Sequence, residues 1–360
     1  FVYKCPSSCT LFPGPVRNTK VLGVIIDDEL NFSYHARQKL QECNKKWGLI
    51  TKTTNRNHGL NISSLTLLWK TMILTKLMYA APICLWKNIN SFKSLWQSAY
   101  MKITGAFLYP SRALTEIALH LPPEVLTEVQ TAKFLCDDNV TSTLLQIEGS
   151  VPELFHHQLL SLKEFIHWKY PEEFGRRTHF VDLLQVKQKG LSLHYTKDEI
   201  LHYQEHRWKR LLTSQMSVVG STQTNDKVAR VLEKMQSNNV NFDRNNFLFN
   251  HRTTKQEDSH IMDFIHGNSP IFGNCRERMS LGDDSCYFCQ NHGDDPLHQL
   301  FRCEEVQDNS YSNLLEVIVN PQDYVNEVLL SRDRTVQKRF IERIGFLMEQ
   351  HQLVYELQDR

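Results

Sequence analysis

The chain has 360 residues, of which 41% are hydrophobic and 22% charged, and its formal net charge is +1. This is the composition of a soluble globular protein, and the length suffices for roughly two or three domains with cores of their own. The nine Cys are scattered and odd in number, which argues against a disulfide framework and favours a reducing compartment. We expect an intracellular protein of the nucleus and cytoplasm. The most apolar run, residues 72–86, is interrupted by Lys76, so no membrane span is expected.

Charge is spread unevenly along the chain. Residues 1–135 carry 16 Lys and Arg against 7 Asp and Glu, a net +9, whereas the remainder carries 25 against 33, a net −8. A basic first third on a near-neutral chain indicates a polyanionic partner, and a solvated basic face is the alternative. The chain begins at Phe1 with no signal-peptide pattern, and we expect it to be cut from something longer.

Residues 1–30 are predicted to be extended and to form a short β-hairpin. Residues 20–26 (KVLGVII) are an apolar run rich in β-branched residues that ends at Asp27 and Asp28. Two-metal chemistry needs a further carboxylate on a neighbouring strand, but these two aspartates lead straight into a helix. We therefore interpret them as strand-end and turn residues, not as a catalytic pair.

Residues 31–138 are predicted to form a compact helical domain. Ser33 is predicted to cap a long helix, and Asn61 a second helix that ends at Pro82. Three further helices are predicted over residues 91–106, 112–120 and 122–136. The overall fold class is therefore mainly α, with a hairpin in front.

Residues 139–280 are predicted to be a helical connecting region. Its expected helices cover residues 152–168, 198–212, 226–235 and 245–265. No alternating strands with an Asp-rich edge occur here, so a ribonuclease H is not expected. Four histidines on these helices, without a matching Cys, are interpreted as surface or lightly buried residues: His156, His157, His202 and His206. Residues 311–360 are predicted to form C-terminal helices, the last one capped by Asp333.

Residues 281–310 are predicted to form a small zinc-binding module. The expected ligands are Cys286, Cys289, His298 and Cys303. Zinc takes four soft or borderline ligands tetrahedrally, and because protein fills all four positions the site is expected to be structural. One alternative is His292 as third ligand, and another is a set of unpaired thiols without metal. The retroviral knuckle is excluded because its spacing would place the histidine at Asp294.

The order of short motifs in residues 17–138 resembles that of a known family. In sequence these motifs are KVLGVIIDDEL (20–30), NFSYH (31–35), LLWK (67–70), LMYAAP (77–82), MKITGA (101–106) and LHLPP (119–123). The order resembles the region just after the catalytic palm of non-LTR (LINE-type, Jockey-like) retrotransposon reverse transcriptases. The Cys/His cluster in residues 281–304 resembles the zinc-binding segment near the C-terminus of many such elements.

The resemblance implies that residues 1–30 are the palm end with its primer-grip strands, and that residues 31–138 are a thumb that holds template–primer duplex. Gly23 would let the strand backbone approach the primer end because it lacks a Cβ, and a β-bulge is the alternative. The candidate nucleic-acid-binding residues are Lys20, Gly23, Arg37, Lys39, Lys45, Lys46, Lys70 and Lys76.

The implied partners are an RNA template, an RNA–DNA or DNA duplex, and upstream polymerase domains of the same polyprotein. The family's polymerase carboxylates would fall before Phe1, so this chain is expected to be part of an RNA-directed DNA polymerase and inactive alone. The alternative is a domesticated or degenerate helical zinc-containing protein that binds nucleic acid or protein and has no polymerase activity.

Overall fold

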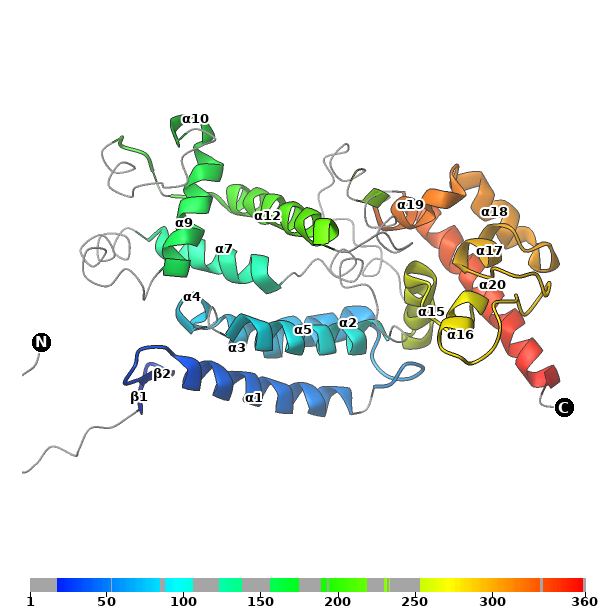
Figure 1. Cartoon of the computed structure of the whole chain (residues 1–360), viewed down its shortest axis with the longest axis horizontal. Helices are drawn as coiled ribbons and strands as arrows, with labels where there is room; N and C mark the ends of the chain where they lie inside the picture. The colour runs from blue at the N-terminus through cyan, green and yellow to red at the C-terminus, as the bar shows by residue number, and fades with distance from the viewer. Residues whose placement is uncertain are drawn as a thin grey trace, which may run out of the picture. The chain divides into compact units, whose positions relative to one another are not determined.

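The computed structural model describes residues 18–52, 54–84, 88–105, 123–137, 156–174, 189–192, 194–218, 230–231, 233, 253–330 and 333–358. Within them the fold is mainly α with one short antiparallel hairpin, which confirms the predicted fold class (Figure 1). The chain gathers into two compact units. The first lies within residues 1–43, 76–92 and 127–195, and the second within 44–75, 93–126 and 196–360. The five domain boundaries expected from the sequence stay a prediction.

The hairpin consists of β1 (Asn18–Val21) and β2 (Val24–Asp27), which are joined by a two-residue turn. The turn residues Leu22 and Gly23 have φ of 48° and 85°, the left-handed values of a type I′ turn. Gly23 therefore lies in the turn. The sequence suggests a position inside a strand, with a β-bulge as the alternative, and the structure shows neither. The left-handed backbone conformation of Leu22 is unfavourable for a residue with a bulky side chain. That side chain is 89% exposed.

Side-chain hydrogen bonds fix the junction between the hairpin and α1 (Ser33–Thr51). The carboxylate of Asp27 accepts from the Asn31 amide at 2.8 Å, and the Asn31 side chain accepts from the Ser33 amide at 2.8 Å. Asp27 thus acts as the strand-end and turn residue that the sequence indicated. Ser33 is the first residue of the helix, and its amide donates to the Asn31 side chain.

The helix predicted from Asn61 to Pro82 is divided into four pieces. They are α2 (Ile62–Leu68), the π-helical segment η1 (Trp69–Leu74), α3 (Thr75–Met78) and α4 (Ala81–Cys84). Asn61 caps the first piece as predicted, accepting from the Ser64 amide at 2.9 Å. Ala80 adopts a φ of 59° between α3 and α4, so the helix ends before Pro82. Pro82 lies in the first turn of α4, where a missing amide donor costs nothing.

In the second unit, aromatic residues from α1, η1 and α5 (Ile89–Thr104) form a continuous buried series. Trp47 meets Trp69 at a centroid distance of 5.0 Å, and Trp69 meets Trp96 at 5.7 Å. Trp96 meets Tyr100 at a further 5.7 Å, and all three contacts are edge-to-face. Each such pair is worth about 0.5–1.5 kcal/mol beyond its burial, so this series ties the three helices together.

The next helices are α7 (Pro123–Leu135), α9 (His156–Lys169), α10 (Pro171–Phe174) and α12 (Lys197–Val218). The first two follow the predicted helices within a few residues. By contrast, α10 has no predicted counterpart, and α12 runs past its predicted end at residue 212. The helix predicted over residues 112–120 lies outside the described residues, as does most of 226–235. The side chains of His156 and His157 also lie outside them, whereas His202 and His206 are exposed, as expected.

The C-terminal helices lie together in the second unit (yellow to red in Figure 1). They are α15 (Lys255–His266), α16 (Gly273–Arg278), α17 (Pro296–Phe301), α18 (Asn309–Val317), α19 (Tyr324–Leu330) and α20 (Arg334–Gln358), with 3-10 turns η4 (Glu304–Val306) and η5 (Pro321–Asp323). Asp333 caps α20 as predicted, accepting from the Thr335 amide at 2.8 Å. Among the described helices, none combines the length and apolarity needed to cross a membrane.

Candidate metal centre

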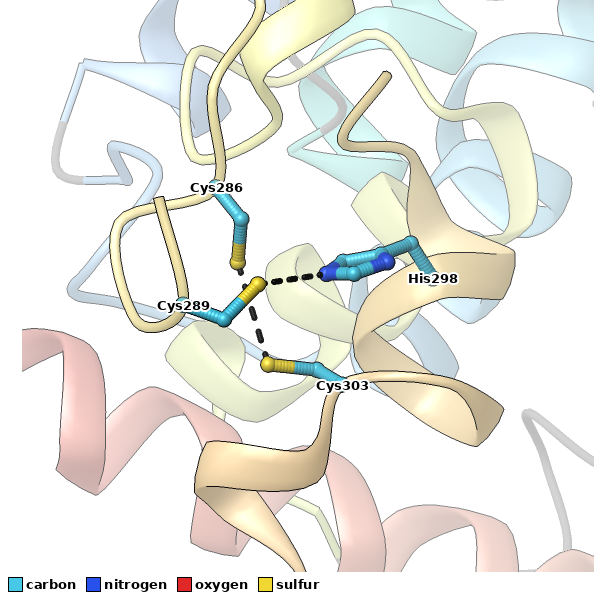
Figure 2. A group of neighbouring side chains, drawn as sticks. All are labelled: Cys286, Cys289, His298 and Cys303. Carbon is cyan, nitrogen blue, oxygen red and sulfur yellow. Dashed lines mark hydrogen bonds between the residues drawn. The ribbon is translucent and has the colours of Figure 1, made fainter. Parts of the chain in front are cut away.

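The four predicted ligands converge in space, and their ligand atoms all lie within 4.8 Å of one another (Figure 2). The sulfurs of Cys286 and Cys303 are 3.9 Å apart, and the Cys289 sulfur lies 3.3 Å from Nε2 of His298. With bonds of about 2.3 Å to sulfur and about 2.0 Å to nitrogen, a tetrahedral ion sets these separations at about 3.8 Å and about 3.5 Å. The thiols are free, not bridged. The cluster could therefore hold one metal ion.

A tight turn presents the first two thiols. The Gln290 amide donates to the Cys286 carbonyl at 3.0 Å, and the Cys286 amide donates to the Asn291 carbonyl at 2.8 Å. Gln290 takes a left-handed φ of 62° to reverse the chain. As a result the side chains of Cys286 and Cys289 point into the same space, the first fully buried and the second partly exposed.

The two ends of α17 present the other pair of ligands. Asp295 begins the helix by accepting from the His298 amide at 2.7 Å. This hydrogen bond fixes the His298 imidazole in the first turn. At the other end the Cys303 amide donates back to the His298 carbonyl at 2.8 Å. Burial lowers the pKa of His298, more than the opposing charge of Asp295 raises it. The imidazole is therefore neutral near pH 7, as a metal ligand must be.

Buried polar residues tie the ligand loops to α16. Asp294 is fully buried, and its carboxylate accepts from the Gly273 amide at 2.8 Å and from the Gln299 side chain at 2.9 Å. Its carbonyl accepts from the Asn274 amide at 3.0 Å. The Gln299 side chain also donates to the Ile271 carbonyl at 3.0 Å. Sequence reasoning missed this network, because an aspartate in a turn-rich stretch carries no sign of burial.

Gly273 is required by a close approach of backbone to backbone. A Cβ added there would lie 2.2 Å from the Asp284 carbonyl oxygen and 2.8 Å from that of Ser285. We expect Gly273→Ala to lower the free energy of unfolding by about 2–4 kcal/mol, because the backbone just before Cys286 would have to shift. Urea denaturation of the metal-loaded chain measures this loss.

The matched control is Gly345→Ala on α20, where an added Cβ has nothing within 4 Å. There alanine is the better helix former, so stability should stay level or rise by up to about 1 kcal/mol. Equal stabilities of the two variants would show that the ligand loops can move away from α16 at no cost.

The ligand loops also pack on α20, so they share buried contacts with the C-terminal helices. Phe288 lies against His351 with ring centroids 4.5 Å apart, and Nε2 of His351 is 3.0 Å from the Gln299 side-chain oxygen. Burial, and to a lesser degree the charge of Arg276, lowers the pKa of His351 to about 3. Arg276 itself stacks 3.8 Å above the ring centre of Tyr287.

His292, the alternative third ligand, lies outside the cluster. Its side chain is 78% exposed, and its Nδ1 is 2.6 Å from the Asp284 carboxylate. That hydrogen bond raises the pKa of His292, which favours the protonated form that cannot bind a metal. The geometry therefore favours His298.

The basic candidate residues occupy the hairpin and the helices after it. Five of these cations are exposed: Lys20, Arg37, Lys45, Lys46 and Lys70. Lys39 and Lys76 both lie near the Glu42 carboxylate, at 3.5 and 3.7 Å. At 100° per residue, Lys39 and Lys46 share one flank of the buried stripe of α1, whereas Arg37 and Lys45 project in other directions. These cations therefore do not share a single face of the helix.

Comparison of the chain with protein-family models, with curated proteins and with solved structures gave no significant match. The function must therefore be inferred from the residues and their geometry.

Proposed function

We propose that this chain is the duplex-holding C-terminal part of a LINE-type reverse transcriptase, with the polymerase carboxylates supplied by upstream domains of the same polyprotein. The observation that supports this most is the order of parts. A hairpin with a Leu-Gly turn leads into helices that carry exposed cations, in a first third of net charge +9, and a Cys/His cluster follows.

A polymerase must slide along any sequence, so its thumb should contact phosphates and the minor groove and not base edges. Cations on helices, spaced by helical turns, suit that task. Because the cations of α1 point in several directions, only a subset would face the duplex. The flank formed by Lys39 and Lys46 and the exposed Lys45 are separate candidates for that subset.

We further propose that the metal is zinc. Three thiolates and one imidazole are a ligand set that zinc prefers, and zinc imposes little geometry beyond the tetrahedron. With four protein ligands no position is left for water, so the bound ion would stabilise the fold and take no part in a reaction. The residues that would hold it are Cys286, Cys289, His298 and Cys303.

The duplex-binding proposal predicts a strong dependence on salt. The full chain should bind an RNA–DNA hybrid, and the logarithm of the binding constant should fall linearly with the logarithm of salt concentration. Replacing both Lys45 and Lys46 with glutamine should weaken binding and make the slope shallower by about 1–2, since each lost phosphate contact removes about one unit. Fluorescence anisotropy over a salt series measures both quantities.

The control removes two charges from α20, by Lys338→Gln and Arg339→Gln, and should leave the slope unchanged. A hybrid affinity that does not depend on salt, or no affinity at all, would contradict the proposal. A chain that holds zinc but binds no duplex would favour the alternative, a helical protein-interaction module.

A further inference from the structure

Helix α15 carries three charged side chains into the core of the second unit. Lys255 is 2% exposed, and Asp258 and Asp263 are each 1% exposed. Burying a charge costs several kcal/mol unless hydrogen bonds and opposite charges compensate. The partners of these side chains therefore show what α15 holds in place.

Two cations cap the C-terminal end of α5. Nζ of Lys255 donates to the carbonyls of Lys102 and Ile103, at 3.0 and 2.5 Å, and Arg56 donates to the Gly105 carbonyl at 3.1 Å. The last carbonyls of a helix lack partners within it and carry the negative end of its dipole. Lys255 satisfies two of them with positive charge, and Arg56 satisfies the carbonyl of Gly105, the residue just past the helix.

The same face of α15 holds the backbone of the preceding loop and the start of α2. Asp258 accepts from the Ile62 amide at 2.7 Å, and Ser259 donates to the Arg56 carbonyl at 2.8 Å. Arg56 also pairs with Asp263. A Cβ on Gly105 would lie 2.1 Å from the Ser259 hydroxyl, so α15 and the end of α5 touch without a gap. We call these hydrogen bonds and the Arg56–Asp263 ion pair, together with the bonds from Lys255 and Arg56 to the end of α5, the α15 clamp.

The other end of α15 is fixed by the helices around the metal cluster. The Tyr324 hydroxyl donates to the Phe264 carbonyl at 2.5 Å, and Phe264 lies against Phe272 with ring centroids 5.0 Å apart. Gly273, the next residue after Phe272, is bonded to Asp294 between the two ligand pairs. A short series of contacts therefore joins the ligand loops to the α15 clamp.

We propose that metal binding at the four-residue cluster holds α15 in register with α5 and α2, so that loss of the metal loosens the α15 clamp on both helices. The inference rests on the metal part of the proposed function and is independent of duplex binding. Structural zinc in small modules has an apparent binding free energy of about 10–16 kcal/mol. That is ample to order loops against α16 and, through them, the far end of α15.

Hydrogen exchange read by mass spectrometry tests the coupling on the full chain at pH 7. Burial lowers the pKa of Lys255 to about 8, so its ammonium is still charged there. On removing zinc with a chelator, we expect amides in residues 100–105 and 62–68 to exchange roughly tenfold faster or more, as for the loss of a charged hydrogen bond. Cys289→Ser should give the same increase without chelator.

Lys255→Met breaks the α15 clamp at α5 and leaves the metal ligands in place. This variant should keep one equivalent of zinc, yet its α5 end should exchange fast whether or not zinc is present. Peptides of α9, which lies in the other unit, serve as the internal reference and should not change.

Each of the following outcomes would overturn the inference. An increase confined to residues 271–306 would show that the ligand loops act alone. An equal increase in α9 would show global unfolding in place of coupling. A purified chain that takes up no zinc would overturn both this inference and the zinc proposal, whereas zinc uptake without a change at α5 overturns the inference alone.

Discussion

Cys289→Ser is expected to reduce bound zinc from one equivalent per chain to nearly none and to unfold the ligand loops locally. Cys289 is partly exposed, so a serine there is tolerated sterically and the effect reports on the lost thiolate. Zinc binding in small structural modules is worth about 10–16 kcal/mol, so the loops should lose a large part of what orders them although they keep their packing on α16 and α20. Elemental analysis of the dialysed protein measures the stoichiometry.

Two other variants make the result specific. Cys275→Ser changes a buried thiol of α16 that is not in the cluster, and it should keep its zinc. His292→Gln removes the alternative ligand and should also keep it, whereas His298→Gln should not. If Cys289→Ser retains a full equivalent, or if His292→Gln loses it, the assignment of ligands is wrong.

The Cys/His cluster could be predicted because its four residues lie close together in the sequence. All four residues fall within 18 positions, and a turn followed by one short helix is enough to bring them together. The surroundings could not be predicted. Arg343 reaches the Gln299 carbonyl across 44 positions, and His351 reaches the Gln299 side chain across 52. No periodicity or spacing links residues so far apart.

Helices were predictable where apolar spacing and caps agree, as at Asn61 and Asp333. The internal break at η1 was not, because the apolar stripe of residues 61–82 is compatible with α-helical and π-helical bonding alike. The hairpin turn was missed for a related reason. Leu22 takes a left-handed conformation that leucine disfavours, so the two residues gave no turn signal.

The basic residues show the limit of charge as a signal. The excess of 16 over 7 in residues 1–135 predicts a class of partner. It does not determine a face, and on α1 the cations flank the buried stripe on both sides. Contacts to duplex therefore stay a prediction, which the salt series addresses.

Arg343→Met is expected to lower the free energy of unfolding by about 2–4 kcal/mol, because buried carbonyl groups would lose the charged donor that satisfies them. The Arg343 side chain is fully buried in α20 and donates to the Val306 carbonyl at 2.7 Å and the Gln299 carbonyl at 3.0 Å. It also pairs with the Asp308 carboxylate at 3.1 Å. Methionine fills much of the same space but donates nothing, so the two carbonyls lose this donor, whereas Asp308 still accepts from Ser310 and Tyr311. Urea denaturation at saturating zinc measures the loss.

The same helix supplies the control, Arg339→Met. Arg339 is 32% exposed and pairs with Glu342 at 3.2 Å, and a surface pair of this kind is worth about 0–1 kcal/mol. Gln299 follows the ligand His298 directly, so Arg343→Met should also weaken zinc binding, whereas Arg339→Met should not. Both variants could instead lose the same small amount of stability. In that case the hydrogen bonds of the buried guanidinium would do no more than offset the cost of its desolvation. Helix α20 would then hold the ligand loops by apolar packing alone.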